Sequence, residues 1–172
     1  PTFDDFKLTK QLRNAIDDLG FSQPTPIQEA SFSLVLSGKD MVGIAQTGTG
    51  KTLAYMLPIL QDLPFSKQVN PRVLVLVPTR ELVIQVVDNI ESIAKYMSIR
   101  VLGVYGGSNI NTQAQSVAQG CDILVATPGR LLDLHNQKAL SLAKVEILVL
   151  DEADRMLDMG FLRDIQRIIA LM

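Results

Sequence analysis

The stretch MVGIAQTGTGKTLAYML, residues 41–57, decides the fold, because it predicts a strand, a loop of small residues and a helix in direct succession. This succession is the context in which a glycine-rich loop binds phosphate groups. Gly48 and Gly50 allow backbone N–H groups to turn inward, and the positive N-terminal end of the following helix points at the same place. Lys51 is then expected to reach the β- and γ-phosphates, and the Thr52 hydroxyl to bind Mg²⁺.

One position departs from the phosphate-loop pattern GxxxxGK[ST], because Ala45 stands where a glycine is usual. Ala45 lies where the chain leaves its predicted strand, so a negative φ suffices there and glycine is not required. A flexible turn with a solvated lysine is the alternative interpretation of a bare Gly-Lys-Thr sequence. The predicted strand and helix on either side favour the phosphate loop.

Four more short apolar segments follow, rich in β-branched residues: VLVLV at 73–77, VLGVY at 101–105, DILVA at 122–126 and EILVL at 146–150. Together with residues 41–45 they predict five strands. Helical patterns lie between them, the clearest formed by Leu82, Val86, Ile90, Ile93 and Met97. This alternation predicts an α/β fold, a mainly parallel sheet with helices on both faces. The length of 172 residues fits a single domain.

The remaining segments carry simpler patterns. A first helix is predicted by Leu8, Leu12, Ile16 and Leu19, which recur at helical spacing after Thr9, a residue suited to cap a helix. The sequence GFSQPTP then interrupts this pattern before a second predicted helix at about 26–36. Pro58 is expected to kink or end the helix that follows the phosphate loop. Residues 61–72, with two prolines, predict a connector on the surface.

Acidic residues follow the last predicted strand in the sequence EILVLDEAD, residues 146–154. Asp151 comes directly after the apolar run, so it is expected at the carboxyl end of the strand, where open α/β sheets bind ligands. Glu152 is then placed to orient or deprotonate an attacking water. Helix capping is the alternative explanation for an acidic residue after a strand. Capping accounts for one carboxylate, but not for three in four positions.

Two other strands, in VLVLVPTRE and DILVATPGR, are each followed at once by a threonine and a predicted helix start. Thr79 and Thr127 suit N-caps, and Pro128 suits the first helical position. Capping alone explains each case. In a parallel sheet, however, these ends share one edge with the phosphate loop, and each adds an arginine, Arg80 or Arg130.

Another predicted strand ends in VYGGSN, where Gly106 and Gly107 permit close approach of a ligand to the backbone. One nucleotide cannot fill all of these helix ends and loops. A row of anion-binding sites along one sheet edge matches the repeated phosphates of a polynucleotide, bound without contacts to the bases.

Composition limits the other classes of protein. The net charge of −2 excludes attraction of nucleic acid by a generally basic surface, so any such partner needs local donors. Cys121 is the only cysteine, which excludes an internal disulfide; we expect it to be buried and the compartment to be cytoplasmic. His135 is the only histidine and is expected on the surface of a short helix. No apolar run has the length of a membrane span.

Six motifs occur in an order and spacing that closely resembles the DEAD-box RNA helicases: GFSQPTPIQ, AQTGTGKT, PTREL, GG, TPGR and DEAD. The resemblance implies a RecA-like P-loop NTPase fold, with residues 1–172 as the N-terminal helicase ATP-binding domain and the Q motif at about 1–30. It also implies an ATP-dependent RNA helicase that uses ATP and Mg²⁺ to bind and locally unwind RNA.

The same resemblance implies a role for individual residues. It implies that Phe21 stacks on the adenine while Gln28 reads its edge, although Thr25 and Gln28 also form a capping box. Phe3 resembles the family's isolated upstream aromatic residue. The remaining ATP-site residues are Gln46, Thr47, Gly48, Thr49, Gly50, Lys51 and Thr52, with Lys51, Asp151 and Glu152 catalytic and Thr52 and Asp151 at the metal, partly through water. The implied RNA contacts are Pro78, Thr79, Arg80, Glu81, Gly106, Gly107, Thr127, Pro128, Gly129 and Arg130, and Asp154 links the two sites.

Two departures from the family pattern stand out. Val83 replaces the common alanine of PTRELA, so we expect local repacking without loss of function. Met172 comes before the family's Ser-Ala-Thr motif and its second RecA-like domain, so we expect a monomeric fragment that needs that domain and does not unwind RNA alone.

Two alternative functions stay open at this point. A small-molecule P-loop kinase would share the phosphate loop and the acidic strand end, but it leaves PTRE and TPGR without a role. An ATP-gated RNA clamp, whose output is binding and not processive unwinding, would use the same residues as a helicase.

Overall fold

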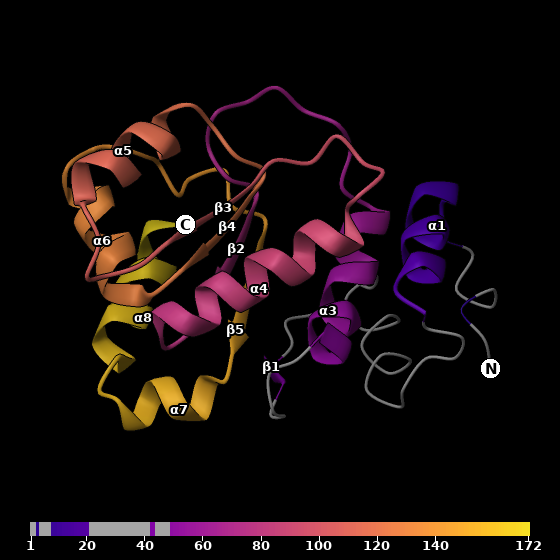
Figure 1. The fold of residues 1–172 in the computed structure, drawn as a ribbon. Helices are drawn as coiled ribbons and strands as arrows, with labels where there is room; N and C mark the ends of the chain where they lie inside the picture. Colours follow the sequence, from indigo (N-terminus) through magenta and orange to yellow (C-terminus); the bar gives the residue numbers. More distant parts are fainter. Residues whose placement is uncertain (1–2, 4–7, 21–41, 44–48) are drawn as a thin grey trace.

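Five parallel strands form one sheet in the computed structural model, which describes residue 3 and residues 8–20, 42–43 and 49–172. The strands are β1 (Val42–Gly43), β2 (Val73–Leu76), β3 (Val101–Val104), β4 (Ile123–Ala126) and β5 (Ile147–Asp151). Their order across the sheet is β1-β5-β2-β4-β3 (Figure 1). The five predicted strands and their parallel pairing are therefore confirmed.

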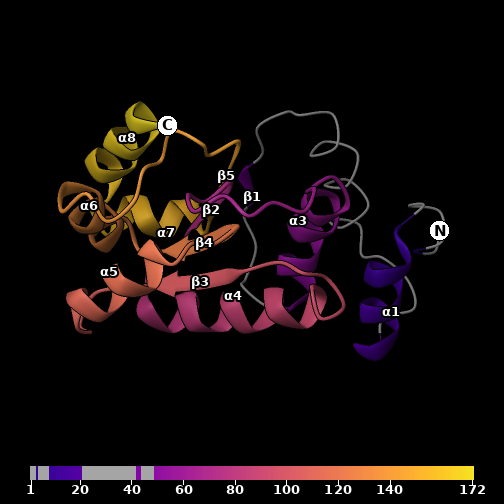
Figure 2. The same ribbon diagram turned by 90° about the horizontal axis from the view of Figure 1, so that it is seen from above.

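Helices cover both faces of this sheet (Figures 1 and 2). They are α1 (Lys10–Asp18), α3 (Thr49–Gln61), α4 (Arg80–Ile93), α5 (Ile110–Ala118), α6 (Pro128–Asn136), α7 (Ala153–Asp158) and α8 (Leu162–Leu171). Val73 and Val75 of β2 pack in one apolar core with α1, α3 and α4, while Leu74 and Leu76 pack in a second core with α5 to α8. Every residue of β2 is buried, as expected of a parallel strand covered on both faces.

The first predicted helix is confirmed as α1. Thr9 stands at its N-cap, where the Oγ1 atom accepts a hydrogen bond from the backbone N–H of Leu12 at 3.5 Å. Leu12 and Ile16 are buried against the core that contains α3 and α4. The second predicted helix, at about 26–36, lies outside the described residues.

Two helix boundaries differ from the predictions. Pro58 was expected to kink or end its helix, and it does not end α3, which continues to Gln61 with the proline inside it. Proline lacks a donor for one intrahelical hydrogen bond, but buried Leu57 and Ile59 hold the segment in the core on both sides. Helix α4 ends at Ile93, so Met97 packs against the core from the turn beyond the helix.

An ion cluster centred on the buried carboxylate of Asp122 closes the edge of the sheet at the amino ends of the strands. Asp122, just before β4, accepts hydrogen bonds from Arg72 Nη2 at 3.0 Å and from Arg100 Nη2 at 3.1 Å. Both arginines also donate to the connector between α3 and β2, at the carbonyl oxygens of Pro64 and Gln68. The cluster therefore fixes the connector to the starts of three strands.

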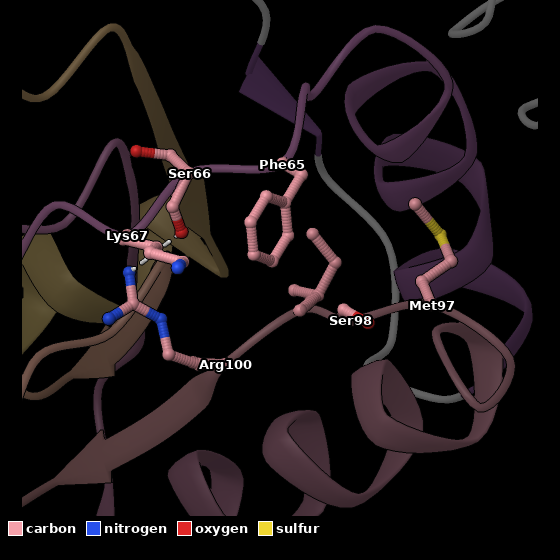
Figure 3. Close-up of a pocket in the computed structure, with 7 residues that line it drawn as sticks. Phe65, Ser66, Lys67, Met97, Ser98 and Arg100 are labelled. Carbon is pink, nitrogen blue, oxygen red and sulfur yellow. Dashed lines mark hydrogen bonds between the residues drawn. The ribbon is translucent and has the colours of Figure 1, made fainter.

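A pocket of about 340 Å³ lies beside this cluster, between the connector and the segment that leads into β3 (Figure 3). Phe65, Lys67, Met97 and Arg100 are among its lining residues. The guanidinium of Arg100 is already engaged by Asp122 and by connector carbonyls. The pocket also lies at the opposite edge from the carboxyl ends of the strands, where ligands of open α/β sheets bind.

Candidate functional site

The predicted phosphate loop and the acidic strand end meet because β1 and β5 are neighbours in the sheet. Gly43 of β1 pairs with Asp151 of β5, and both residues end their strands. Residues 44–48 of the loop lie outside the described part of the chain, which resumes at Thr49, the first residue of α3. Helix α3 is the element after β1, and β1 pairs with β5, the strand that ends at Asp151.

A buried ion pair joins these two elements. Lys51 Nζ lies 2.7 Å from Asp151 Oδ1, and the two side chains are only 6% and 1% exposed. The other carboxylate oxygen, Oδ2, accepts a hydrogen bond from the Tyr55 hydroxyl at 3.0 Å. Lys51 and Tyr55 are four residues apart on α3, so both point to the same side of the helix. The carboxylate is thereby held between the charge of the Lys51 ammonium group and the hydroxyl donor of Tyr55.

Burial raises the pKa of Tyr55 well above its usual value, and the negative charge of Asp151 raises it further, while a hydrogen bond with Thr52 partly opposes the shift. Tyr55 is therefore a neutral phenol that donates to Asp151 at physiological pH. A permanent donor of this kind orients the carboxylate without adding charge to the site.

Thr52 is fully buried at the same end of α3. Asn89 of α4 donates a hydrogen bond from Nδ2 to its Oγ1 atom at 3.4 Å. This contact crosses the interface between α3 and α4, two helices packed in the same core. The hydroxyl of Thr52 is thus placed by a second helix as well as by its own.

The donor set fits a magnesium ion that is bound together with a nucleotide. It comprises one buried carboxylate, Asp151, and one buried hydroxyl, Thr52, beside the ammonium group of Lys51. Within the described ranges, no group of three or more His, Cys, Asp or Glu side chains could hold a metal ion. Mg²⁺ commonly binds through one or two carboxylates and substrate phosphates, and does not require a cage made only of protein ligands.

Glu152 has an unusual backbone conformation, with φ 56° and ψ 50° in the left-handed region. A residue with a Cβ atom pays a conformational cost there, so such positions cluster at functional sites. Glu152 occupies the N-cap position of α7, but its side chain makes no capping hydrogen bond. Its Oε1 atom lies 3.8 Å from Arg155 Nη1. Capping therefore does not explain the glutamate at this position.

The other predicted helix starts follow β2 and β4, on the half of the edge away from β1. Thr79 is confirmed as the N-cap of α4, since its Oγ1 atom accepts from the backbone N–H of Leu82 at 3.3 Å. Thr127 stands at the N-cap position of α6, with Pro128 following, but its side chain makes no capping hydrogen bond. The predicted N-cap position of Thr127 is therefore confirmed, but without the side-chain hydrogen bond of a cap; its backbone N–H donates to the Val104 carbonyl of β3, at 3.2 Å.

Both arginines of these helix starts contact the region that follows β3. The guanidinium carbon of Arg80 lies 5.1 Å from the centre of the Tyr105 ring, in a cation–π contact. Arg130 donates from Nη1 to the Ser108 carbonyl at 3.1 Å and to Gln113 Oε1 at 2.8 Å. The ends of β2, β3 and β4 are thus tied together by side chains.

The glycines at this edge differ in backbone conformation and in the space around them. Gly107 has φ 79°, a conformation that favours glycine. A Cβ atom on Gly106 or Gly129 would meet no atom within 4 Å. These two glycines therefore leave open space beside the backbone, as expected where a ligand approaches closely.

The strand order divides the predicted site residues into two groups. Lys51, Thr52, Asp151 and Glu152 cluster at β1 and β5, and Asp154 is exposed in the first turn of α7. The second group lies at the ends of β2, β4 and β3: Pro78, Thr79, Arg80, Glu81, Gly106, Gly107, Thr127, Pro128, Gly129 and Arg130. The predictions for Phe21, Gln28, Gln46, Thr47 and Gly48 lie outside the described residues.

Four contact residues were not predicted from the sequence: Tyr55, Asn89, Tyr105 and Gln113. The positions of two of them could have been inferred from helical spacing. Tyr55 follows Lys51 by one helical turn, and Asn89 follows Val86 at a spacing that places it beside the buried stripe of α4. Tyr105 and Gln113 act through tertiary contacts that no local pattern reveals.

Comparisons with known proteins identify relatives of this chain. The family model described as DEAD/DEAH box helicase matches residues 25–172. The chain is 47% identical to the ATP-dependent RNA helicase RhlB of Pseudomonas putida, over 97% of this chain and 44% of that protein. It is 46% identical to the ATP-dependent RNA helicase CshA of Listeria monocytogenes, over 97% of this chain and 32% of that protein.

A solved structure is also similar to this fold. It is a hypothetical ATP-dependent RNA helicase from Sulfolobus tokodaii, with a TM-score of 0.85 and 42% identity over 95% of this chain and 47% of that one. The chain thus spans less than half the length of each of these three proteins. Among the helices that the structure describes, none is long and apolar enough to cross a membrane.

Proposed function

Because the chain belongs to the DEAD/DEAH box helicase family, we propose that it is the ATP-binding half of an RNA-dependent ATPase that locally unwinds RNA duplexes. The observation that carries this proposal is the buried pair of Lys51, in the first turn of α3, and Asp151, at the end of β5. Lysine and carboxylate at these positions are the two charged groups that a P-loop NTPase needs for phosphates and for metal.

On this proposal, Lys51 binds the β- and γ-phosphates of ATP, and Thr52 and Asp151 hold Mg²⁺, partly through water. Magnesium, when bound, supplies positive charge that offsets the charge developing on the phosphates. Tyr55 and Asn89 orient Asp151 and Thr52 through the hydrogen bonds described above. Glu152 accepts a proton from the attacking water at its carboxylate, and Asp154 couples this half of the edge to the other. The adenine contacts assigned to Phe21 and Gln28 belong to the same proposal.

RNA binds along the ends of β2, β4 and β3 through its sugar-phosphate backbone, with no base specificity. Arg80 and Arg130 supply positive charge, and the start of α4 supplies backbone N–H groups. The open space at Gly106 and Gly129 supports close approach of the strand. A small-molecule kinase is not favoured, because it would give these helix starts no role.

We further propose that a second RecA-like domain completes the site, since the curated relatives are more than twice as long as this chain. The 172-residue chain alone is then a monomer that binds ATP weakly. A cytoplasmic location is supported by Cys121, a free thiol buried beside β4.

The deciding test measures RNA-stimulated ATP hydrolysis in a form of the protein that carries both domains. Lys51→Ala and Glu152→Gln should each abolish it, and turnover retained by either variant would refute the assigned role. Duplex unwinding by the 172-residue chain alone would contradict the proposal that half of the site lies on another domain. Single-turnover unwinding by the two-domain form separates a helicase from an ATP-gated RNA clamp.

A further inference from the structure

Gln113 links two loops of the edge where we place RNA. It lies on α5 and is only 8% exposed. Its Nε2 atom donates to the backbone carbonyl of Tyr105 at 3.1 Å, and its Oε1 atom accepts from Arg130 Nη1 at 2.8 Å. One buried amide therefore spans the distance between the end of β3 and the start of α6. A buried amide that satisfies both its donor and its acceptor in this way is held in one orientation.

The partners of Arg130 leave its positive charge available. Both acceptors of Nη1, the Gln113 amide oxygen and the Ser108 carbonyl, are neutral. The carboxylate of Asp133 lies 3.9 Å from Nε and is 61% exposed, so water screens its interaction with the arginine. The guanidinium is thus fixed in place without being neutralised, which suits an arginine that must pair with a phosphate.

The same amide connects indirectly to the second arginine. Tyr105, whose carbonyl accepts from Gln113, presents its ring to Arg80. Arg80 and Arg130 follow β2 and β4, which pair directly in the sheet. The contacts therefore form a continuous series from Arg80 through Tyr105 and Gln113 to Arg130.

We propose that Gln113 is a positioning residue for RNA binding, which holds the Arg130 guanidinium in the orientation that meets an RNA phosphate. This inference rests on the proposed function, because it assumes that RNA binds at this edge. Gln113 itself does not touch the RNA. It lowers the conformational entropy that Arg130 loses on binding, since the side chain is already ordered.

The alternative is that Gln113 only satisfies buried polar groups of the fold. A double-mutant cycle separates the two, because a residue that acts through Arg130 has no effect once Arg130 is removed. Binding of fluorescein-labelled U10 RNA to the 172-residue chain is measured by fluorescence anisotropy at low salt. Gln113→Met should weaken binding about five-fold in the native background and leave it unchanged in an Arg130→Gln background.

Gln115→Met is the matched control, since it makes the same chemical change at an exposed position of the same helix. It should bind U10 as the native chain does. The proposal is overturned if Gln113→Met binds RNA as tightly as the native chain, or if it weakens binding equally in both backgrounds. Gln113→Asn, which keeps an amide but shortens the side chain, replaces Gln113→Met if the latter does not fold.

A second measurement does not depend on RNA. The ¹⁵N heteronuclear NOE of the Arg130 Nε–Hε group should report a rigid side chain in the native chain and a mobile one in Gln113→Met. An equally rigid Arg130 in the variant would overturn the positioning role. If the native chain does not bind U10 at all, the RNA contacts proposed for this edge of the sheet fail without deciding the ATPase, and the NOE still decides whether Gln113 orders Arg130.

Discussion

Lys51 Nζ and Asp151 Oδ1 lie 2.7 Å apart in a site from which water is almost excluded. Each group is the counter-ion of the other, and removal of one partner of a buried pair leaves an uncompensated charge. The pair therefore contributes to folding as well as to the proposed binding of ATP. Loss of activity in a variant at either position needs a control for loss of structure.

Lys51→Met should destabilise the chain by about 3 kcal/mol, because the Asp151 carboxylate stays buried without its counter-ion. The double variant Lys51→Met/Asp151→Asn should recover most of this stability, since no charge remains buried. Chemical denaturation measures the stabilities of the single and the double variant. Affinity for a fluorescent ATP analogue should be lost in both variants. Equal stability of the single variant and the native chain would show that the pair does not stabilise the fold.

Asp122 should give the fold an acid-sensitive contribution. Burial alone would raise the pKa of Asp122, but hydrogen bonds from the side chain and backbone of Arg100, and from Arg72, outweigh it and lower the pKa. A carboxyl group with a lowered native pKa stabilises the fold above its unfolded pKa, near 3.8, and this stability is lost as the pH falls toward the native pKa.

Asp122→Asn should therefore cost about 3 kcal/mol at pH 7, and the difference from the native chain should shrink as the pH falls below 3.8. Asp62→Asn, at an exposed carboxylate in the connector, is the matched control and should have little effect. Urea unfolding at a series of pH values provides the measurement. A difference that stays constant into acid would exclude the ionised carboxylate as its source.

Val83 of α4 packs against Gly103 of β3. Val83 is fully buried, and its Cγ1 atom would lie 2.8 Å from a Cβ atom added to Gly103. Gly103→Ala should thus destabilise the chain by about 2 kcal/mol through overpacking. Val83→Ala in the same chain should relieve part of this cost, although Val87 also lies close.

Thermal unfolding tests the relation, with Gly106→Ala as the control, because a Cβ atom there meets nothing within 4 Å. If Val83→Ala and Gly103→Ala destabilise the chain additively, the two side chains do not compete for the same space. Non-additive changes in stability would show that the two positions share the same space. Glycine at position 103 would then explain how the chain accommodates a valine where the family commonly has alanine.

Much of the fold and of the site could be predicted from the sequence, because its signals are local. Apolar runs predicted the five strands, and Asp151 was expected at a strand end because it directly follows such a run. The pairing of β1 with β5 could not be predicted, since strand order depends on packing between distant segments. Tyr105 and Gln113 were missed for the same reason. The continuation of α3 through Pro58 reflects burial of its neighbours, which outweighs the local preference.

Tyr55 should make the fold sensitive to alkali. Its pKa is raised well above the usual value of 10.0, so the unfolded chain ionises this tyrosine before the native chain does. Stability that depends on the neutral phenol is present below pH 10 and is lost as the pH rises further. Absorbance at about 295 nm should show fewer than three ionised tyrosines until the protein unfolds. Tyr55→Phe should remove this retained tyrosine and cost about 2 kcal/mol at neutral pH, through the lost bond to Asp151.

The ring of Tyr105, and not its hydroxyl, should matter for RNA binding. Arg80 lies over the ring at 5.1 Å, and a cation–π contact of this kind is worth about 0.5–1 kcal/mol at an exposed site. Tyr105→Leu should therefore weaken binding of U10 RNA about three-fold, whereas Tyr105→Phe, which keeps the ring, should bind like the native chain. Anisotropy titrations of both variants, repeated in an Arg80→Gln background, provide the measurement. Because the ring acts on RNA only through Arg80, the loss in Tyr105→Leu should vanish in that background, and a loss that persists would assign Tyr105 a contact of its own.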